Sequence, residues 1–121
     1  MVVWQWSSTT KQWLRFYGTQ PDNDPTGSQF HATNIVIQMV QTRPGPYNES
    51  GPHSPDVDSI TTGTGKLYVL RGGLVETGTW SRAVGGNITK FSFPNGKLMP
   101  LQAGNTWYEL VPDDITVTIT R

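Results

Sequence analysis

The sequence predicts an all-β domain, an antiparallel sandwich or partly open barrel of about eight to ten short strands with little or no helix. Apolar residues come in short runs between turn residues, and no segment keeps a helical period. Glycine (13) and proline (9) are plentiful, as turns require. Charged residues make up only 15% of the chain, and threonine takes their place at exposed strand positions, where its branched side chain suits a pleated surface.

The first half contains three expected strands. Val2–Trp6 and Gln12–Tyr17 are joined by a polar turn, and a loop rich in proline, aspartate, asparagine and glycine follows over Gly18–Gln29. Asn34–Thr42 is partly apolar on both faces, which predicts a central, well-buried strand. Residues 43–55 contain four prolines, and because proline removes ladder donors we expect a loop there.

The second half is expected to consist mainly of hairpins. Asp56–Ile60 is a candidate edge strand, and the dipeptides Gly72-Gly73 and Asn95-Gly96 predict tight two-residue turns. One short helix around Ser81–Asn87 is the alternative to an entirely β structure. The other strands that we expect are Lys66–Arg71, Leu74–Trp80, Lys90–Phe93, Lys97–Leu101, Thr106–Val111 and the cleanly alternating Ile115–Thr120.

Composition excludes several classes of function. The formal net charge is +0, so the chain lacks the basic excess that nucleic-acid binding needs. The absence of cysteine excludes disulfides, thiol catalysis and cysteine-ligated metal sites. No run approaches the roughly 18 apolar residues of a membrane span, so we expect no direct membrane insertion. We expect a single domain over residues 1–121, and its abrupt start in a strand, without a signal peptide, suggests an excised domain.

A succession of motifs carries a family resemblance. It begins with the strand of Trp4 and Trp6, Leu14-Arg15-Phe16, the acidic loop Asp22-Asn23-Asp24 and Asn34-Ile35-Val36-Ile37. It continues with Gly63-Thr64-Gly65-Lys66 before Leu67–Arg71, then Gly72-Gly73 before Thr77-Gly78-Thr79-Trp80-Ser81, and finally the stretch from Phe91 to Pro112. In this order the motifs resemble the C-terminal domain of the YerB-like family of bacterial lipoproteins, which has no known function.

This resemblance implies a longer parent protein. Family members have a lipoprotein signal and an N-terminal domain before this one, so the parent would be held on the outer face of a cytoplasmic membrane through a lipidated cysteine. We therefore expect an extracytoplasmic location and the N-terminal domain as a partner. The family has no established activity or catalytic residues that could be assigned to this chain. Residues 43–55 depart from the tight family pattern.

The two short motifs that end in tryptophan have a structural interpretation. Gly78 and Gly104 allow close backbone approach, a bulge or a positive φ. Trp80 and Trp107 would then fill a core layer, because large aromatic side chains dominate small cores.

An aromatic cluster is the candidate ligand-binding surface, formed by Trp4, Trp6, Trp13 and Tyr17. In a hairpin, the first two rings project from one face, and Trp13, Arg15 and Tyr17 share a face of the next strand. If this surface is exposed, it suits stacking on a cell-envelope glycan or peptide. We favour the alternative that these rings belong to the core or to an interface with the N-terminal domain, because exposed aromatic patches are uncommon on monomers.

Metal and cofactor signals are weak. The segment Asp22–Gly27 is similar to the start of a calcium loop, which makes Asp22 and Asp24 weak metal candidates. The twelfth position of such a loop is Thr33 rather than a bidentate glutamate, so we favour an ordinary aspartate-rich turn. We expect no cofactor, because the chain has no phosphate-binding loop or dinucleotide fingerprint.

Catalytic signals are equally sparse. His31 lies near Asp22 and Asp24 in the sequence and is a candidate general base, while His53 lies in the proline-rich loop. We favour a structural role for His31, because a lone histidine at a strand end is more often a structural group than a catalytic one. No serine or threonine lies in a nucleophile elbow. Four carboxylates are candidates for the acid pair of a glycoside hydrolase, namely Asp56, Asp58, Glu76 and Glu109. We favour ordinary surface charges, because the spacing of Asp56 and Asp58 is common on edge strands.

Three functions remain open from the sequence. We favour a non-catalytic β module with a binding or architectural role. The alternatives are a glycan- or peptide-binding module that uses the aromatic face, and one half of a hydrolase site shared with the N-terminal domain.

Overall fold

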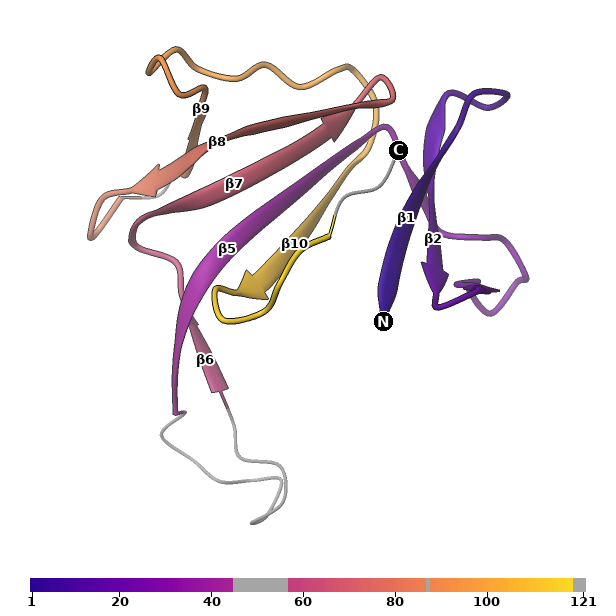
Figure 1. Cartoon of the computed structure of the whole chain (residues 1–121), viewed down its shortest axis with the longest axis horizontal. Coiled ribbons are helices and arrows are strands. Elements are labelled where there is room, and N and C mark those ends of the chain that lie inside the picture. Colours follow the sequence, from indigo (N-terminus) through magenta and orange to yellow (C-terminus); the bar gives the residue numbers. More distant parts are fainter. Residues whose placement is uncertain (45–56, 87, 119–121) are drawn as a thin grey trace.

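A computed structural model describes residues 1–44, 57–86 and 88–118, and these form ten strands in two sheets without a helix (Figure 1). The small sheet has the order β1-β2-β3, with β4 also pairing with β2. Its strands are β1 (Val2–Ser7), β2 (Gln12–Tyr17), β3 (Gln20–Pro21) and β4 (His31–Ala32). The prediction of an all-β fold is confirmed.

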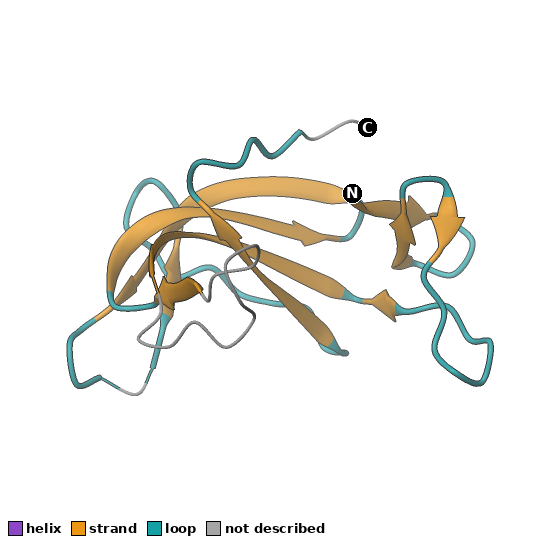
Figure 2. Ribbon diagram, turned by 90° about the horizontal axis from the view of Figure 1, so that it is seen from below, coloured by secondary structure: helices purple, strands orange, loops and turns teal. Residues whose placement is uncertain are grey.

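The large sheet has the order β10-β5-β7-β8-β9, and β6 extends one end of β5. The small sheet lies at one end of it (Figure 2). The strands of the large sheet are β5 (Asn34–Pro44), β6 (Val57–Ile60), β7 (Gly63–Arg71), β8 (Leu74–Arg82), β9 (Lys90–Ser92) and β10 (Thr106–Pro112).

One ladder departs from the antiparallel pattern that we predicted. β10 pairs with β5 in parallel, with Thr106 opposite Asn34 and Pro112 opposite Val40. A parallel pair needs a long crossover connection, and here the whole chain between the two strands provides it. The remaining described ladders are antiparallel.

Strand β5 is buried on both faces, as its sequence predicts. Its alternate side chains enter two separate cores. The first core contains the buried residues Val36, Val40, Leu67, Val69, Trp80 and Met99, with Phe91, Phe93 and Leu101 packed on them. The second core contains Trp13, Ala32, Ile35 and Leu70, with Trp4, Trp6, Ile37, Tyr68, Val75 and Trp107 packed on them. The segment after β9 therefore covers one face of the large sheet, and the small sheet covers the other.

The carboxamide of Asn34 fastens the covering segment to the sheet. This side chain is fully buried, so its polar atoms need partners. Its Nδ2 donates to the carbonyl of Gln102 at 2.8 Å, and its Oδ1 accepts from the Gln102 amide at 2.9 Å. The start of β5 is thereby bonded to the segment that leads into β10.

The two predicted turns differ in outcome. Gly72-Gly73 closes the β7–β8 hairpin, and both glycines have positive φ, as a two-residue turn of this type requires. At Asn95-Gly96 the chain also turns back, but only a single bridge joins Ser92 to Leu98. The prediction of a strand over Lys97–Leu101 is therefore wrong. The amide of the buried Met99 still donates to the carbonyl of Phe91 in β9 at 2.8 Å. Pro100 has no N–H to donate, so the pairing does not extend into a strand beyond this point.

The chain ends differ from the predicted strands as well. The predicted strand Ile115–Thr120 is absent from its described part, residues 115–118, because the segment turns back after β10 and pairs with no strand there (Figure 1). Ser81 and Arg82 extend β8, so the alternative of a helix around Ser81–Asn87 is wrong for its described residues. Residues 45–56, which include most of the predicted loop, and residues 87 and 119–121 lie outside the described part.

Glycines permit close packing around Trp80, in agreement with the structural interpretation of the tryptophan motifs. The backbone of Gly78 lies so near the carbonyl of Ser92 that a Cβ would overlap it. Gly104, in the motif of Trp107, has a φ of +133° and approaches Thr33 rather than Trp80. The buried Trp80 donates from Nε1 to the carbonyl of Met39 at 2.7 Å. Gly65, opposite Trp80 in the ladder, leaves room for this indole.

We predict that Gly65→Ala destabilises the fold. An added Cβ would lie 2.3 Å from Trp80 Nε1 and 2.6 Å from the Met39 carbonyl oxygen, so the indole or the backbone must move. Overpacking of this kind costs about 1–3 kcal/mol in free energy of unfolding, measurable by urea denaturation. Thr79→Ala, at an exposed position on β8, is the control and should change stability by less than about 0.5 kcal/mol. Equal stability of the two variants would contradict this account of Gly65.

Candidate functional site at the junction of the two sheets

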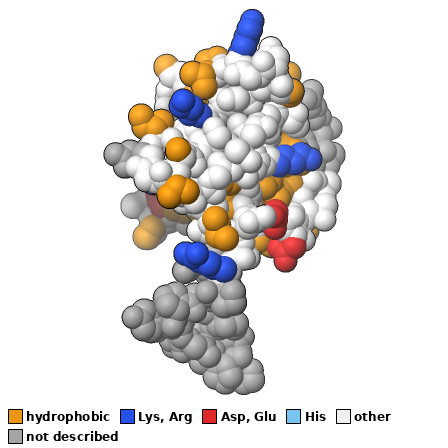
Figure 3. Space-filling view, turned by 90° about the vertical axis from the view of Figure 1, so that its left-hand side faces the viewer, with side chains coloured by type: hydrophobic (Ala, Val, Ile, Leu, Met, Phe, Trp, Pro, Cys, Tyr) orange, Lys and Arg blue, Asp and Glu red, His pale blue; other side chains and the backbone are white. Residues whose placement is uncertain are grey.

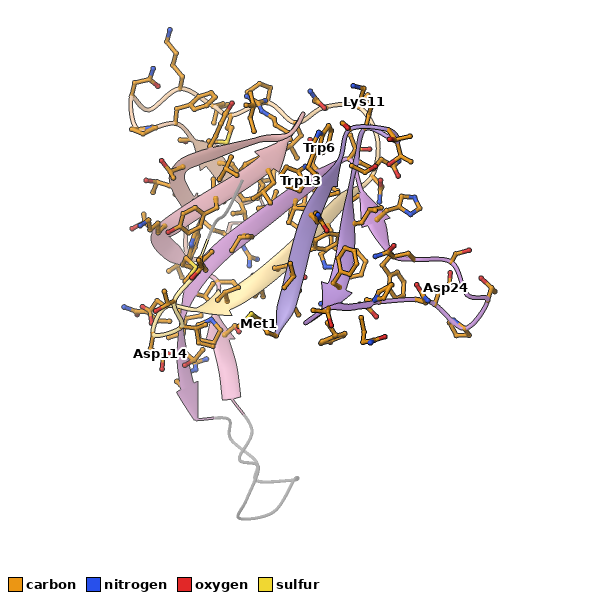
Figure 4. The ribbon with its side chains drawn as sticks, turned by 45° about the vertical axis from the view of Figure 1, so that its right-hand side comes forward. Met1, Trp6, Lys11, Trp13, Asp24 and Asp114 are labelled. Carbon is orange, nitrogen blue, oxygen red and sulfur yellow. The ribbon has the colours of Figure 1, made fainter. Side chains whose placement is uncertain are left out.

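The aromatic residues singled out in the sequence form a row on the inner face of the β1–β2 hairpin. The register places Trp6 opposite Trp13, Trp4 opposite Arg15 and Val2 opposite Tyr17. The Trp6 and Trp13 rings are 5.3 Å apart, centroid to centroid, and both point toward the large sheet (Figure 4). These three ladder pairs, which we call the junction row, run from the buried side of the hairpin to its exposed end.

Strand β10 supplies the opposite side of the junction. The ring of Trp107 meets Trp4 edge-on, with centroids 5.3 Å apart, and it meets Phe30 at 5.4 Å in a similar geometry. Trp107 therefore connects the small sheet with an edge strand of the large sheet.

Arg15 is the charged centre of this cluster. It is only 9% exposed, and it forms ion pairs with Asp22 and Glu109. The Arg15 Nε lies 3.3 Å from Glu109 Oε1, which joins β2 to β10. Its guanidinium carbon lies 5.1 Å from the ring centre of Trp107, 5.2 Å from that of Tyr17 and 5.7 Å from that of Trp4.

Electrostatics keep the Arg15 guanidinium charged. Burial alone lowers its pKa, but the hydrogen bond to Asp22, the neighbouring Tyr17 and the charge of Glu109 together raise the pKa above its ordinary value. A guanidinium in this state is a permanent cation that donates hydrogen bonds and does not exchange protons. The junction can therefore orient groups and hold anions, but Arg15 cannot serve it as a base.

Asp22 and Asp24 have separate structural partners. Asp22 pairs with Arg15, whereas Asp24 organises the turn that follows it. The Asp24 Oδ1 accepts from the Thr26 hydroxyl at 2.6 Å, from the Thr26 amide at 2.9 Å and from the Ser28 amide at 3.1 Å. The hydroxyl of Thr26, followed by the backbone amides, lowers the pKa of the Asp24 carboxyl. This is the geometry of an aspartate-rich turn, and within the described residues no three metal-ligating side chains gather.

The remaining catalytic candidates lie apart from one another. His31 is exposed, and its Nδ1 lies 3.1 Å from the carbonyl of Gln29. Glu76 pairs with Arg71, its two oxygens each 3.0 Å from Nη2, while Glu109 pairs with Arg15. The two glutamates thus belong to separate ion pairs. The other candidates cannot be placed: His53 and Asp56 lie outside the described residues, as does the side chain of Asp58.

Sequence reasoning placed the four aromatic candidates on shared faces but missed the ionic centre between the sheets. Trp13 is 6% exposed, Trp4 and Trp6 are half-buried, and Tyr17 is 54% exposed. A usable signal was present, because Arg15 lies between Trp13 and Tyr17 on an inward-facing strand, and a charge there requires a counter-ion. No local pattern identified Glu109, which is 94 residues away, as that counter-ion.

Comparison with known proteins gives this arrangement a family. Residues 1–108 match the family model described as the C-terminal domain of a protein of unknown function, DUF3048. The chain belongs to this family. The resemblance to the YerB-like C-terminal domain predicted from the motifs is thereby confirmed.

A solved structure agrees with this membership. The crystal structure of YerB from Bacillus subtilis superposes with a TM-score of 0.72 at 23% sequence identity, over 93% of this chain and 36% of the YerB chain. This similarity establishes a shared fold. The DUF3048 domain described here thus spans about a third of the length of its structural relative. No curated protein matches the chain. Within the described residues, no helix has the length and apolar character of a membrane span.

We predict that Arg15→Met destabilises the domain strongly. The substitution removes the counter-ion of two partly buried carboxylates, Asp22 and Glu109. The loss of one partner of a buried ion pair lowers the free energy of unfolding by about 3 kcal/mol or more. Urea denaturation followed by tryptophan fluorescence measures the loss, and the exposed Lys97→Met is the control. The triple variant that adds Asp22→Asn and Glu109→Gln should recover part of the loss, because it leaves no unpaired charge. A triple variant less stable than Arg15→Met would contradict the electrostatic explanation.

A second prediction concerns the turn at Asp24. Thr26→Val removes the hydroxyl bond and should move the pKa of the Asp24 carboxyl upward toward its ordinary value, as measured by NMR titration. Because the folded-state pKa is lowered, the turn contributes stability above the ordinary aspartate pKa and loses it as the pH falls through the folded-state pKa. Ser28→Ala keeps the backbone donor and should leave the titration unchanged. Equal pKa shifts in the two variants would refute the role of the Thr26 hydroxyl.

Proposed function

We propose that this domain is a non-catalytic β module of an extracytoplasmic bacterial lipoprotein, and that it packs against the N-terminal domain of its parent protein. The observation that carries the proposal is the exposed end of the junction row. There the ladder pair Val2 and Tyr17 continues the aromatic row beyond the part that the large sheet covers.

The position of this pair in the chain favours the parent's own preceding domain as its partner. Val2 is the first residue of β1, so a preceding segment would enter the fold at this end of the hairpin. YerB is a longer chain of which this domain matches 36%, which is consistent with additional structure in the parent. A tyrosine suits such an interface because it combines a large apolar ring with a polar hydroxyl.

The chemistry of the junction supports an architectural role over a catalytic one. Arg15, Asp22 and Glu109 are bonded to one another, and these bonds join β2 to the following loop and to β10. Charges used in this way stabilise the arrangement of the two sheets. A rigid junction presents Tyr17 in a fixed position, which reduces the entropy lost when a partner binds.

Exposure of Tyr17 also favours one alternative, the binding of a cell-envelope glycan or peptide. The ring of Tyr17 is accessible on one side and contacts the Arg15 guanidinium on the other, so it is oriented for stacking. The three tryptophans are less available, since Trp13 is buried and Trp4 and Trp6 pack in the second core. A ligand would therefore depend on Tyr17 more than on the tryptophans.

The test compares Tyr17→Ala with Tyr108→Ala, because these tyrosines are 54% and 56% exposed. Each variant is made in the isolated domain and in the full-length parent, and thermal and urea unfolding are measured. In the isolated domain each variant should lower the free energy of unfolding by less than about 1 kcal/mol, because the contacts of an exposed ring contribute little to stability. In the parent, Tyr17→Ala should lower the free energy of unfolding by at least about 1 kcal/mol more than in the isolated domain, because the tyrosine would be buried in the interface between the domains. Tyr108→Ala should not change between the two contexts.

Two results would count against the interdomain contact. Equal effects of Tyr17→Ala in both contexts would overturn it. The glycan-binding alternative would be favoured by a different pair of results. Peptidoglycan fragments would quench tryptophan fluorescence saturably in the original protein but not in Tyr17→Ala, and Tyr17→Ala would have equal effects on unfolding in both contexts.

A further inference from the structure

A second surface feature lies at the opposite end of the large sheet from the junction. It is an open pocket of about 730 Å³ beside the connection between β8 and β9. That connection lies at the left of Figure 1. Its lining residues come from β7, β8, β9 and the turn, and they are Gly63, Thr64, Ser81, Arg82, Ala83, Gly86, Ile88 and Lys90.

The strand register brings polar groups of three strands together in this pocket. Thr64 of β7 lies opposite Ser81 of β8, and Ser81 lies opposite Lys90 of β9. Directly opposed residues project from the same face of a sheet, so two hydroxyls and one ammonium form a row. Arg82, the last residue of β8, starts from the opposite face of the strand. It also lines the pocket at the end of the strand, where it adds a guanidinium.

The guanidinium of Arg82 is held in place by neutral acceptors. Its Nε donates to the carbonyl of Gly86 at 2.8 Å, and its Nη1 donates to the hydroxyl of Thr61 at 3.3 Å. These bonds orient the group without neutralising its charge, and they leave donors on the two amino nitrogens. The ion pairs found in residues 1–44, 57–86 and 88–118 involve neither Arg82 nor Lys90.

The pocket therefore combines two cations and two hydroxyl donors, and its described lining residues include no carboxylate. Basic and hydrophobic side chains are spread over this side of the molecule, whereas the acidic ones gather at one edge (Figure 3). Oriented arginine, a flexible lysine and hydroxyl groups are the donors that bind tetrahedral oxyanions.

We propose that this pocket binds a phosphate group, with Arg82 and Lys90 as charged donors and Thr64 and Ser81 as hydroxyl donors. Two apolar side chains of the β8–β9 connection are exposed to solvent: Ile88, which lines the pocket, is 75% exposed, and Val84, which follows the lining residue Ala83, is 90% exposed. The same chemistry fits a free phosphate or the headgroup of an anionic lipid, whose acyl region Val84 and Ile88 would contact. This site is distinct from the Val2–Tyr17 surface and does not depend on the interdomain proposal.

The first experiment titrates the isotope-labelled protein with inorganic phosphate at constant ionic strength, with chloride as the comparison anion. We expect saturable NMR shifts at the amides of Thr64, Ser81, Arg82 and Lys90, and at the Arg82 Nε–H. Lys90→Gln should weaken binding about tenfold or more, since it removes a charge-assisted hydrogen bond. Lys97→Gln, at another exposed lysine, is the matched control and should bind like the original protein.

The second experiment distinguishes the source of the phosphate group. Vesicles of phosphatidylglycerol and of phosphatidylcholine are sedimented with the protein and with the variants Lys90→Gln and Arg82→Gln. A lipid headgroup is supported if the protein cosediments with phosphatidylglycerol but not with phosphatidylcholine, and if Lys90→Gln abolishes this binding. A free phosphate is supported if phosphate binds saturably and the protein cosediments with neither lipid.

Two outcomes would overturn the proposal. One is that phosphate and phosphatidylglycerol both fail to bind. The other is that their binding persists in Lys90→Gln and in a folded Arg82→Gln. If Arg82→Gln loses the native spectrum, Lys90→Gln decides the question, because Lys90 is exposed and its removal leaves the bonds around Arg82 in place.

Discussion

Residues 34–40 of strand β5 are withdrawn from water on both faces of the sheet, and the rest of the fold depends on this constraint. Its alternating apolar side chains, with Ile35 on one face and Val36 on the other, require a covering layer on each side of the sheet. The small sheet supplies one layer and the segment around Met99 supplies the other. Each layer is fastened by polar groups as well as by apolar contact: Arg15 joins the small sheet to β10, and Asn34 bonds the covering segment at Gln102.

The ionic junction shows how a chain with few charges uses them. Arg15 is surrounded by aromatic rings, where an isolated charge is costly, and two carboxylates with three ring faces offset that cost. The junction thereby fixes the hairpin against the large sheet with directional contacts, which apolar packing alone does not provide. At the opposite end of the sheet, the cations Arg82 and Lys90 lack such counter-ions among the described residues. The same fold thus separates structural charges from charges open to a ligand.

Local structure was predictable from the sequence, whereas long-range pairing was not. The Gly72-Gly73 hairpin and the two-faced strand β5 follow from turn chemistry and from side-chain alternation. Alternation of side chains also predicted a strand at Ile115–Thr120, but its described residues pair with no other strand. Alternation indicates which side chains share a face, but it does not identify the strand that pairs with the segment. The parallel partner of β5 and the contact from Arg15 to Glu109 join segments far apart in the chain, so no short window of sequence contains them.

The parallel ladder between β5 and β10 also has a consequence for how the chain folds. β5 is synthesised early, but the partner on one of its edges is made last, and 72 residues separate Asn34 from its neighbour Thr106. Closing so long a loop is entropically costly and slows folding. The same late strand brings Trp107 and Glu109 to the β1–β2 hairpin, at the other end of the domain. Until β10 has been translated, both the sheet edge and the sheet junction remain open, so the native state of the domain forms only when its first and last strands meet.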